Sequence, residues 1–117
     1  TMIAAARRRN RDHEREGKAA FATKALADMT FGSRRFDKVL AINVNLFWRD
    51  AARELAIIRN VLAPRGQLHL TFEPPTVGQV ERMAKETVAR LEAGGFSGVV
   101  VRKGTGTTAR LIHVSAV

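Results

Sequence analysis

The most apolar stretch of the chain predicts a central β-strand. From Val39 to Leu46 six of the eight residues are apolar, and the two exceptions are Asn43 and Asn45. A short, continuous apolar run is typical of a parallel strand that is covered on both faces. We therefore expect Val39 to Val44 to form a buried strand that leads into two amide side chains.

Three other segments are predicted to be helices, the first from its alanines and apolar start and the second from apolar residues at the spacing of one buried helical face. They are Met2 to about Glu16, the stretch after Asp50 with Leu55, Ile58 and Leu62, and the stretch after Thr76 with Val77, Val80, Met83, Ala84, Val88 and Leu91. Each segment is followed by residues that end helices: Gly17, then Pro64 with Gly66, then Gly94 with Gly95. Asp50 is expected to cap the second helix, and Thr76 with Gln79 to form a capping box for the third.

Further strands are expected between and after these helices. Ala19 to Ala25 is a candidate short strand, Gln67 to Phe72 is a second strand, and the tail carries two strands joined by Lys103 to Thr108. The order predicts an α/β fold, a partial Rossmann-like sheet of parallel strands that finishes in an antiparallel hairpin. We expect residues 1–117 to form a single, incomplete domain.

The composition narrows the functional classes. The net charge is +9, which favours an anionic partner such as nucleic acid, but the basic residues are scattered and the Arg7–Arg9 run is diluted by Asp12 and Glu14. The chain has no cysteine, so disulfides and cysteine chemistry are excluded, and a reducing, cytoplasmic location fits. Its three histidines lack the spacing of metal ligands, so we expect no metal site, and His69 is expected to be partly buried with its hydrogen bonds satisfied.

Two longer stretches resemble a known family. "FDKVLAINVNLFW" followed by "ELAIIRNVLAPRGQLHLTFEPP" is similar to the carboxyl-side part of class I S-adenosylmethionine-dependent methyltransferases, with Arg65 in place of the first of two usual glycines. "TMIAAARRRN" resembles the helix after that family's second strand, and the final hairpin resembles the family's last strands. The resemblance covers essentially the whole chain and implies methyl transfer from S-adenosyl-L-methionine.

The resemblance also identifies a part of the family pattern that this sequence does not contain. The family's glycine-rich turn, which holds the methionyl end of the cofactor, has no counterpart, since no G-x-G-x-G occurs. We expect the first β-α-β unit to be missing, and this chain alone to be deficient in cofactor binding. The family's sheet order then leaves the Val39–Val44 strand with a free edge, which another copy of the chain, a swapped element or a separate N-terminal piece would cover.

The candidate site residues follow from this comparison and from the strand ends. Open α/β sheets bind ligands at the carboxyl ends of their strands, and this places three residues near the cofactor: Asn43, Val44 and Asn45. The alternative is that the two amides cap the next loop. Phe47 and Trp48 either form an apolar wall over the transferred methyl group or pack against the following helix.

Four other positions complete the candidate site. Ala25 and Leu26 match the family position that contacts adenine, although alanine cannot supply a hydrogen-bonding side chain. Met2 either packs against the adenosine or belongs to the core. Glu73 faces the same end of the sheet and is a candidate substrate contact or base, with a structural capping role as the alternative.

The sequence does not identify the methyl acceptor, because methyl transfer needs positioning more than a protein nucleophile. A small molecule is the favoured acceptor. The rival hypothesis is a non-enzymatic basic α/β module that binds nucleic acid or another acidic partner through its arginine-rich first helix.

Overall fold

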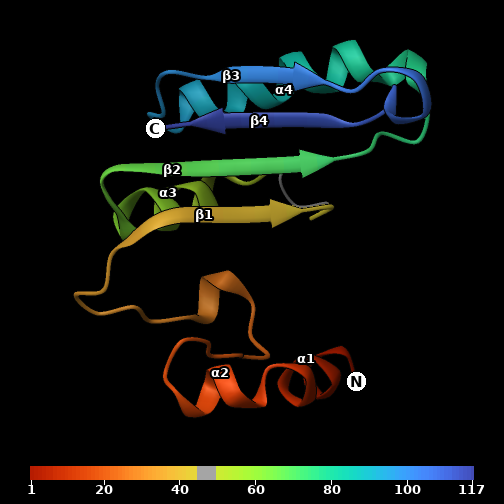
Figure 1. Cartoon of the computed structure of the whole chain (residues 1–117). Helices are drawn as coiled ribbons and strands as arrows, with labels where there is room; N and C mark the ends of the chain where they lie inside the picture. Colours follow the sequence, from red (N-terminus) through yellow and green to blue (C-terminus); the bar gives the residue numbers. More distant parts are fainter. Residues whose placement is uncertain (45–49) are drawn as a thin grey trace.

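The computed structural model describes residues 1–44 and 50–117, and all statements about the structure refer to them. The helices are α1 (Met2–Arg9), α2 (Arg11–Arg15), α3 (Ala52–Val61) and α4 (Val80–Ala93). The strands are β1 (Phe36–Ile42), β2 (Leu62–Phe72), β3 (Val100–Lys103) and β4 (Ile112–Ala116), which form one sheet in the order β1-β2-β4-β3 (Figure 1). Short 3₁₀ turns cover Leu26–Asp28, Val77–Gln79 and Gly106–Thr108.

The sheet topology confirms the predicted fold class. β1 and β2 are parallel and are joined through α3, while β4 runs antiparallel to both β2 and β3. β3 and β4 are the predicted terminal hairpin. The capping box is present as well, because the backbone N–H of Thr76 donates to Oε1 of Gln79 at 3.2 Å before α4 begins.

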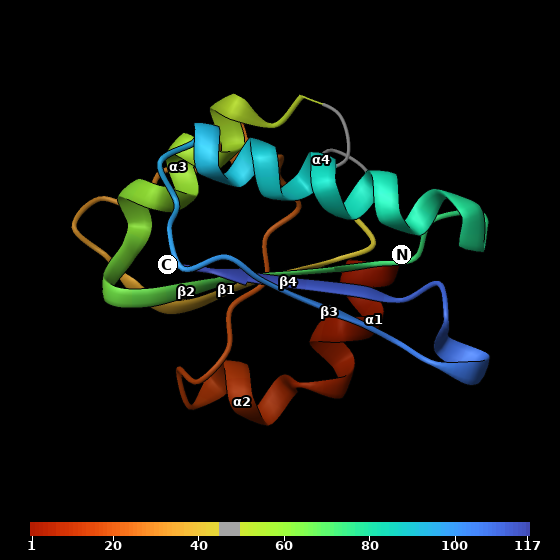
Figure 2. The same cartoon turned by 90° about the horizontal axis from the view of Figure 1, so that it is seen from above.

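One face of the sheet carries the hydrophobic core. Figure 2 shows α3 and α4 side by side over this face. Alternate residues of the inner strands point toward these helices, as the period of two in a strand requires. The buried residues of these strands are Leu68, Leu70, Phe72, Ile112, Val114 and Ala116, and they pack with Leu55 and Ile58 of α3 and Val80, Ala84 and Leu91 of α4.

The prediction that the central strand is buried on both faces is wrong. β1 begins at Phe36 and ends at Ile42, and its alternate residues Leu40 and Ile42 are 67% and 68% exposed. Val39 and Ala41, which point to the other face, pack against the core. The apolar run led to a wrong prediction because α1 and α2 do not cover β1. These helices lie on the open side of the sheet, but they stand beyond β1 rather than over it (Figures 1 and 2).

Two other expected elements differ from the structure. The helix predicted from Met2 to Glu16 is divided at Asn10, whose side-chain amide donates to the carbonyl of Ala6 at 2.9 Å. The strand predicted for Ala19 to Ala25 is absent from the sheet. Alanine adds little to a strand that has no neighbour to pair with, so this stretch stays irregular.

The turn that opens β2 contains Arg65, the residue that departs from the family pattern. Arg65 has a φ of 67°, a left-handed conformation that glycine adopts more readily than arginine. The next residue must be glycine, since a Cβ on Gly66 would lie 2.8 Å from the carbonyl oxygen of Ala63 and 3.0 Å from that of Phe36. The register between β1 and β2 shifts at this turn. Phe36 lies opposite Leu62, and the pairing starts again with Lys38 opposite Gln67.

Membrane insertion through a helix finds no support in the part of the chain that is described. None of the helices there combines the length and the apolar character needed to cross a bilayer.

Candidate functional site

The carboxyl ends of β1 and β2 are tied together by Asn43. Its backbone N–H donates to the carbonyl of Thr71 at 2.8 Å, and its side-chain Oδ1 accepts from the backbone N–H of Glu73 at 3.2 Å. Asn43 has a φ of 52°, a left-handed conformation that asparagine tolerates better than most residues. The chain therefore turns sharply out of β1 at this residue, and Val44 follows with 41% of its surface exposed.

Glu73 continues this cluster toward the hairpin. Its carboxylate Oε2 lies 3.6 Å from Nη2 of Arg110, which precedes β4. The other terminal nitrogen, Nη1, donates to the carbonyl of Pro75 at 3.0 Å. We call Asn43, Glu73 and Arg110 the strand-end cluster; it joins the ends of β1 and β2 to the terminal hairpin.

The cluster bears on Asn43 and Glu73, for each of which the sequence left open a role in the site and a structural role. The carboxamide oxygen of Asn43 accepts a hydrogen bond from the backbone of Glu73, as the loop-capping alternative expects, and contact of Asn43 with the cofactor stays a prediction. Glu73 is exposed and does not cap a helix; the structure pairs its carboxylate with Arg110 instead. Sequence reasoning missed Arg110, because the contact spans 37 positions and no local motif marks it.

The other predicted site residues lie outside this cluster or outside the described residues. Met2 is 90% exposed on α1, so it is not a core residue, and the N-terminus lies on the same side of the molecule as the carboxyl ends of β1 and β2 (Figure 1). Ala25 is exposed, and Leu26 is half-buried and packs against the core. Asn45, Phe47 and Trp48 fall in residues 45–49, which the description does not cover.

The start of α3 borders an open cavity. The prediction that Asp50 caps α3 is wrong, because the N-cap is Ala51 and no side chain caps the helix. Oδ1 of Asp50 instead accepts from the backbone N–H of Ala52 at 3.4 Å, one residue before the N-cap position. Between the N-terminal part of α3 and the C-terminal part of α4 is an open cavity of about 490 Å³. Asp50, Leu55, Ala56, Arg90 and Gly94 line it.

Two histidines that are distant in sequence meet on the open face of the sheet. Nδ1 of His69 lies 3.0 Å from Nε2 of His113, and Nε2 of His69 lies 3.2 Å from Oε1 of Gln67. His69 is therefore the satisfied, half-buried residue that was expected. Within residues 1–44 and 50–117 no three histidine, aspartate or glutamate side chains gather as a metal site would require.

This pair makes the stability of the fold depend on pH. Burial lowers the pKa of His69, and the neighbouring His113 and Lys38 lower it further. The unfolded chain, with a histidine pKa of about 6.5, then binds more protons than the folded chain below that pH. Because stability rises with pH wherever the unfolded state binds more protons, the contribution is present above the unfolded pKa and is lost as pH falls.

We expect urea denaturation to show a lower free energy of unfolding at about pH 5 than at about pH 7.5, and His69→Gln to reduce this difference. The matched control is His13→Gln, which removes an exposed histidine outside the pair. An unchanged pH difference in His69→Gln would contradict the assignment.

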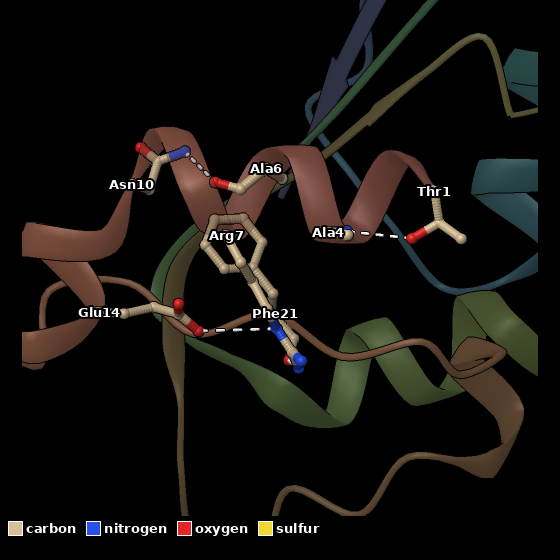
Figure 3. A network of polar contacts seen from close by, with 7 residues as sticks. All are labelled: Thr1, Ala4, Ala6, Arg7, Asn10, Glu14 and Phe21. Atoms are coloured by element: carbon tan, nitrogen blue, oxygen red, sulfur yellow. Dashed lines mark hydrogen bonds and ion pairs between the residues drawn. The ribbon is translucent and has the colours of Figure 1, made fainter.

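Some of the basic side chains of α1 and α2 make contacts within the fold. Nη2 of Arg7 donates to the carbonyl of Phe21 at 2.9 Å, and Nε of the same residue lies 3.8 Å from the carboxylate of Glu14 (Figure 3). These contacts tie α1 to α2 and to the irregular segment that follows. Arg15 and Lys18 are similarly paired with Asp12 and Glu16.

Comparison with known proteins identifies the class. The sequence model of a family described as "Methyltransferase domain" matches residues 1–70, which include α1, β1, α3 and most of β2. The chain belongs to this methyltransferase family, as its sequence indicated. No curated protein matches the chain.

Solved structures confirm the fold. The citrinin polyketide synthase CMeT domain is similar with a TM-score of 0.75 and 20% identity, over 98% of this chain and 36% of that chain. A glycopeptide N-methyltransferase gives 0.74 and 15%, over 98% and 68%. Magnesium protoporphyrin IX methyltransferase from Synechocystis, with bound SAH, gives 0.66 and 17%, over 98% and 58%. The chain thus spans between about a third and two thirds of the length of these three relatives.

Proposed function

We propose that this chain is the carboxyl-side portion of a methyltransferase that uses S-adenosyl-L-methionine, and that the ends of β1 and β2 form one wall of its cofactor and acceptor site. The observation that carries the proposal is the sharp turn at Asn43, held to Glu73 at the carboxyl end of the parallel strands, in a member of the methyltransferase family. Ligands of open α/β sheets bind at this end.

The described residues would suit contact with the adenosyl part of the cofactor, but they offer no cradle for its methionyl end. The turn at Asn43 leaves Val44 partly exposed beside the strand end, which suits contact with an adenosyl group. Ala25 is exposed but offers only its backbone, while Leu26 supplies apolar surface and Met2 is free to pack against a ligand. When bound, the sulfonium cofactor would supply the activated methyl group, and the role of the protein is to orient the acceptor and exclude water.

The polar cradle for the methionyl end must come from elsewhere. No glycine-rich turn occurs in these 117 residues, and the similar methyltransferases are longer chains. We therefore expect the chain by itself to bind the cofactor poorly and to be inactive. A further segment, or a second chain, would complete the pocket.

A small molecule is the acceptor that we propose. The names of the similar proteins include a polyketide synthase domain and a magnesium protoporphyrin methyltransferase, which supports this choice only by analogy. Glu73 would contact the polar part of the acceptor from the strand-end cluster, with Arg110 holding its carboxylate in place. Phe47 and Trp48 are proposed as the apolar wall.

The rival function, binding of nucleic acid through the first helix, has less support. Arg7 is used within the fold, and acidic residues pair with Arg15 and Lys18. Counterion release would make such binding weaken steeply with added salt.

The proposed function is tested by the binding of S-adenosylhomocysteine to this chain and to a longer polypeptide that adds a glycine-rich unit before Thr1; only the longer one should bind.

A further inference from the structure

A cavity of about 360 Å³ lies at the end of the sheet opposite the strand-end cluster. It is formed by the last turn of α3, the turn that opens β2 and the segment that follows α4. Figure 1 shows the start of β2 and the C-terminus at this end of the sheet, and the arrowhead of β2 at the other end. Because a strand rises about 3.3 Å per residue, Gly66 of the cavity and Glu73 of the cluster are roughly 20 Å apart. The cavity is therefore separate from the proposed cofactor and acceptor site.

Two arginines from different elements line this cavity. Arg59 belongs to the last turn of α3, and Arg65 belongs to the turn that opens β2. Within residues 1–44 and 50–117 neither guanidinium has an ion-pair partner or a side-chain hydrogen bond. Arg110 of the strand-end cluster, by contrast, has both. The N–H donors of the two cavity arginines are thus available to a ligand.

The backbone around the cavity holds both arginines in place. Gly95 leaves room for the first of them, because a Cβ at Gly95 would lie 2.5 Å from Nη1 and 2.9 Å from Cζ of Arg59. Arg65 has a φ of 67°, at which an arginine costs conformational free energy that a glycine would not. Residues held in such conformations cluster at ligand-binding and active sites, so the strain at Arg65 is a reason to look for a ligand there.

The rest of the lining indicates the size and polarity of that ligand. Leu62, Ala63 and Phe96 supply apolar surface, and Ser97 adds a hydroxyl group. None of the described lining residues is an aspartate or a glutamate. A volume of about 360 Å³ is at the low end of the range for small-molecule sites, about 300–1,000 Å³. The cavity therefore suits a small organic molecule with an anionic end.

The charges around the cavity favour an anion in spite of the two helix ends. α3 and α4 both end beside it, and a helix C-terminus carries a negative charge of about half an elementary charge. The two ends together oppose an anion with about one elementary charge, whereas the two arginines supply two full positive charges. The balance stays positive.

We propose that this cavity binds a small phosphate monoester, with Arg59 and Arg65 holding the phosphate and Leu62 and Phe96 contacting the organic part. Guanidinium groups bind phosphate oxygens through two parallel hydrogen bonds. A phosphate monoester has three terminal oxygens and a charge of about −1.5 to −2, so it can engage both arginines at once. A carboxylate has only two oxygens and a single charge. The proposal does not depend on methyl transfer.

The test is an NMR titration of the isotope-labelled 117-residue chain with phenyl phosphate at constant ionic strength. The backbone amides of Arg65, Gly66 and Gly95 report binding, and inorganic phosphate and benzoate are the comparison ligands. The variants are Arg59→Gln and Arg65→Gln. The matched control is Arg53→Gln, at an exposed arginine of α3 that does not line the cavity.

We expect saturable shifts at these amides with phenyl phosphate, and weaker binding of inorganic phosphate and of benzoate. Each cavity variant should bind phenyl phosphate about tenfold more weakly or worse, because it loses hydrogen bonds between charged groups. Arg53→Gln should bind as the parent chain does. Shifts that do not saturate, equal binding of benzoate, or an equal loss in Arg53→Gln would overturn the inference. So would tighter binding of single-stranded DNA that the cavity variants abolish, because the arginines would then hold a phosphodiester chain.

Arg65→Gly provides an independent check. Glycine adopts the left-handed conformation without strain but has no guanidinium. The midpoint of urea unfolding should therefore rise while the binding of phenyl phosphate weakens. A raised midpoint with undiminished binding would show that Arg65 does not hold the phosphate, and the inference would be wrong.

Discussion

Phe72→Ala is expected to lower the free energy of unfolding by about 3–5 kcal/mol, the usual cost of emptying a buried aromatic site. Phe72 is only 2% exposed, lies at the end of β2 opposite Ile112 of β4 and belongs to the core beneath α3 and α4. The change leaves a cavity where the core meets the strand-end cluster. For a domain of ordinary stability, between about 5 and 15 kcal/mol, this is a large share of the total.

The measurement is urea denaturation followed by circular dichroism, with Leu40→Ala as the matched control. Leu40 stands in the same sheet but is 67% exposed, so its truncation should change the free energy of unfolding by about 0.5 kcal/mol or less. Equal losses in the two variants would mean that the two faces of the sheet are equally covered, and the arrangement described above would be wrong.

Asn43→Ala is expected to weaken S-adenosylhomocysteine binding by about tenfold or more when introduced into a longer, binding-competent polypeptide. The substitution removes the Asn43–Glu73 hydrogen bond, and alanine disfavours the left-handed backbone that asparagine tolerates. Together these effects destabilise the turn by on the order of 1–3 kcal/mol. We expect the end of β1 to move relative to β2 as a result. Isothermal titration calorimetry measures the change in Kd.

Asn43→Gly separates the two causes. Glycine accepts the φ of 52° but cannot bridge to Glu73, so a loss of similar size implicates the carboxamide. Restored affinity in Asn43→Gly would implicate backbone strain. Asn60→Ala, on the exposed side of α3, serves as the control that should retain affinity, and unchanged affinity in both Asn43 variants would contradict a role for the turn in the site.

The order of elements was predictable because it depends on local pattern. The apolar run from Val39 to Ile42 in β1, the capping box at Thr76 and the glycines after α4 each indicate their element within a few residues. The same local logic failed for Ala19 to Ala25, where the composition permits a strand but no neighbour pairs with it. It also failed at Asn10, whose side chain bonds to the carbonyl of Ala6 and divides the first helix.

The site was predictable only in outline, because its contacts join distant parts of the chain. The position of Asn43 and Glu73 at one end of the sheet follows from the parallel strands. Their mutual hydrogen bond, the ion pair of Glu73 with Arg110 and the meeting of His69 with His113 depend on strand register and on the hairpin. The exposure of Leu40 and Ile42 could not be read from their hydrophobicity, since that property reports the tendency to be buried rather than the presence of a covering segment.

The most direct test of the account is a calorimetric titration of the 117-residue chain with S-adenosylhomocysteine, followed by the same titration of a polypeptide that adds the glycine-rich unit. We expect no binding by the first and one-to-one binding by the second. Tight one-to-one binding by the 117 residues alone would show that the pocket is complete within them, and it would contradict the claim that the ends of β1 and β2 form only one of its walls.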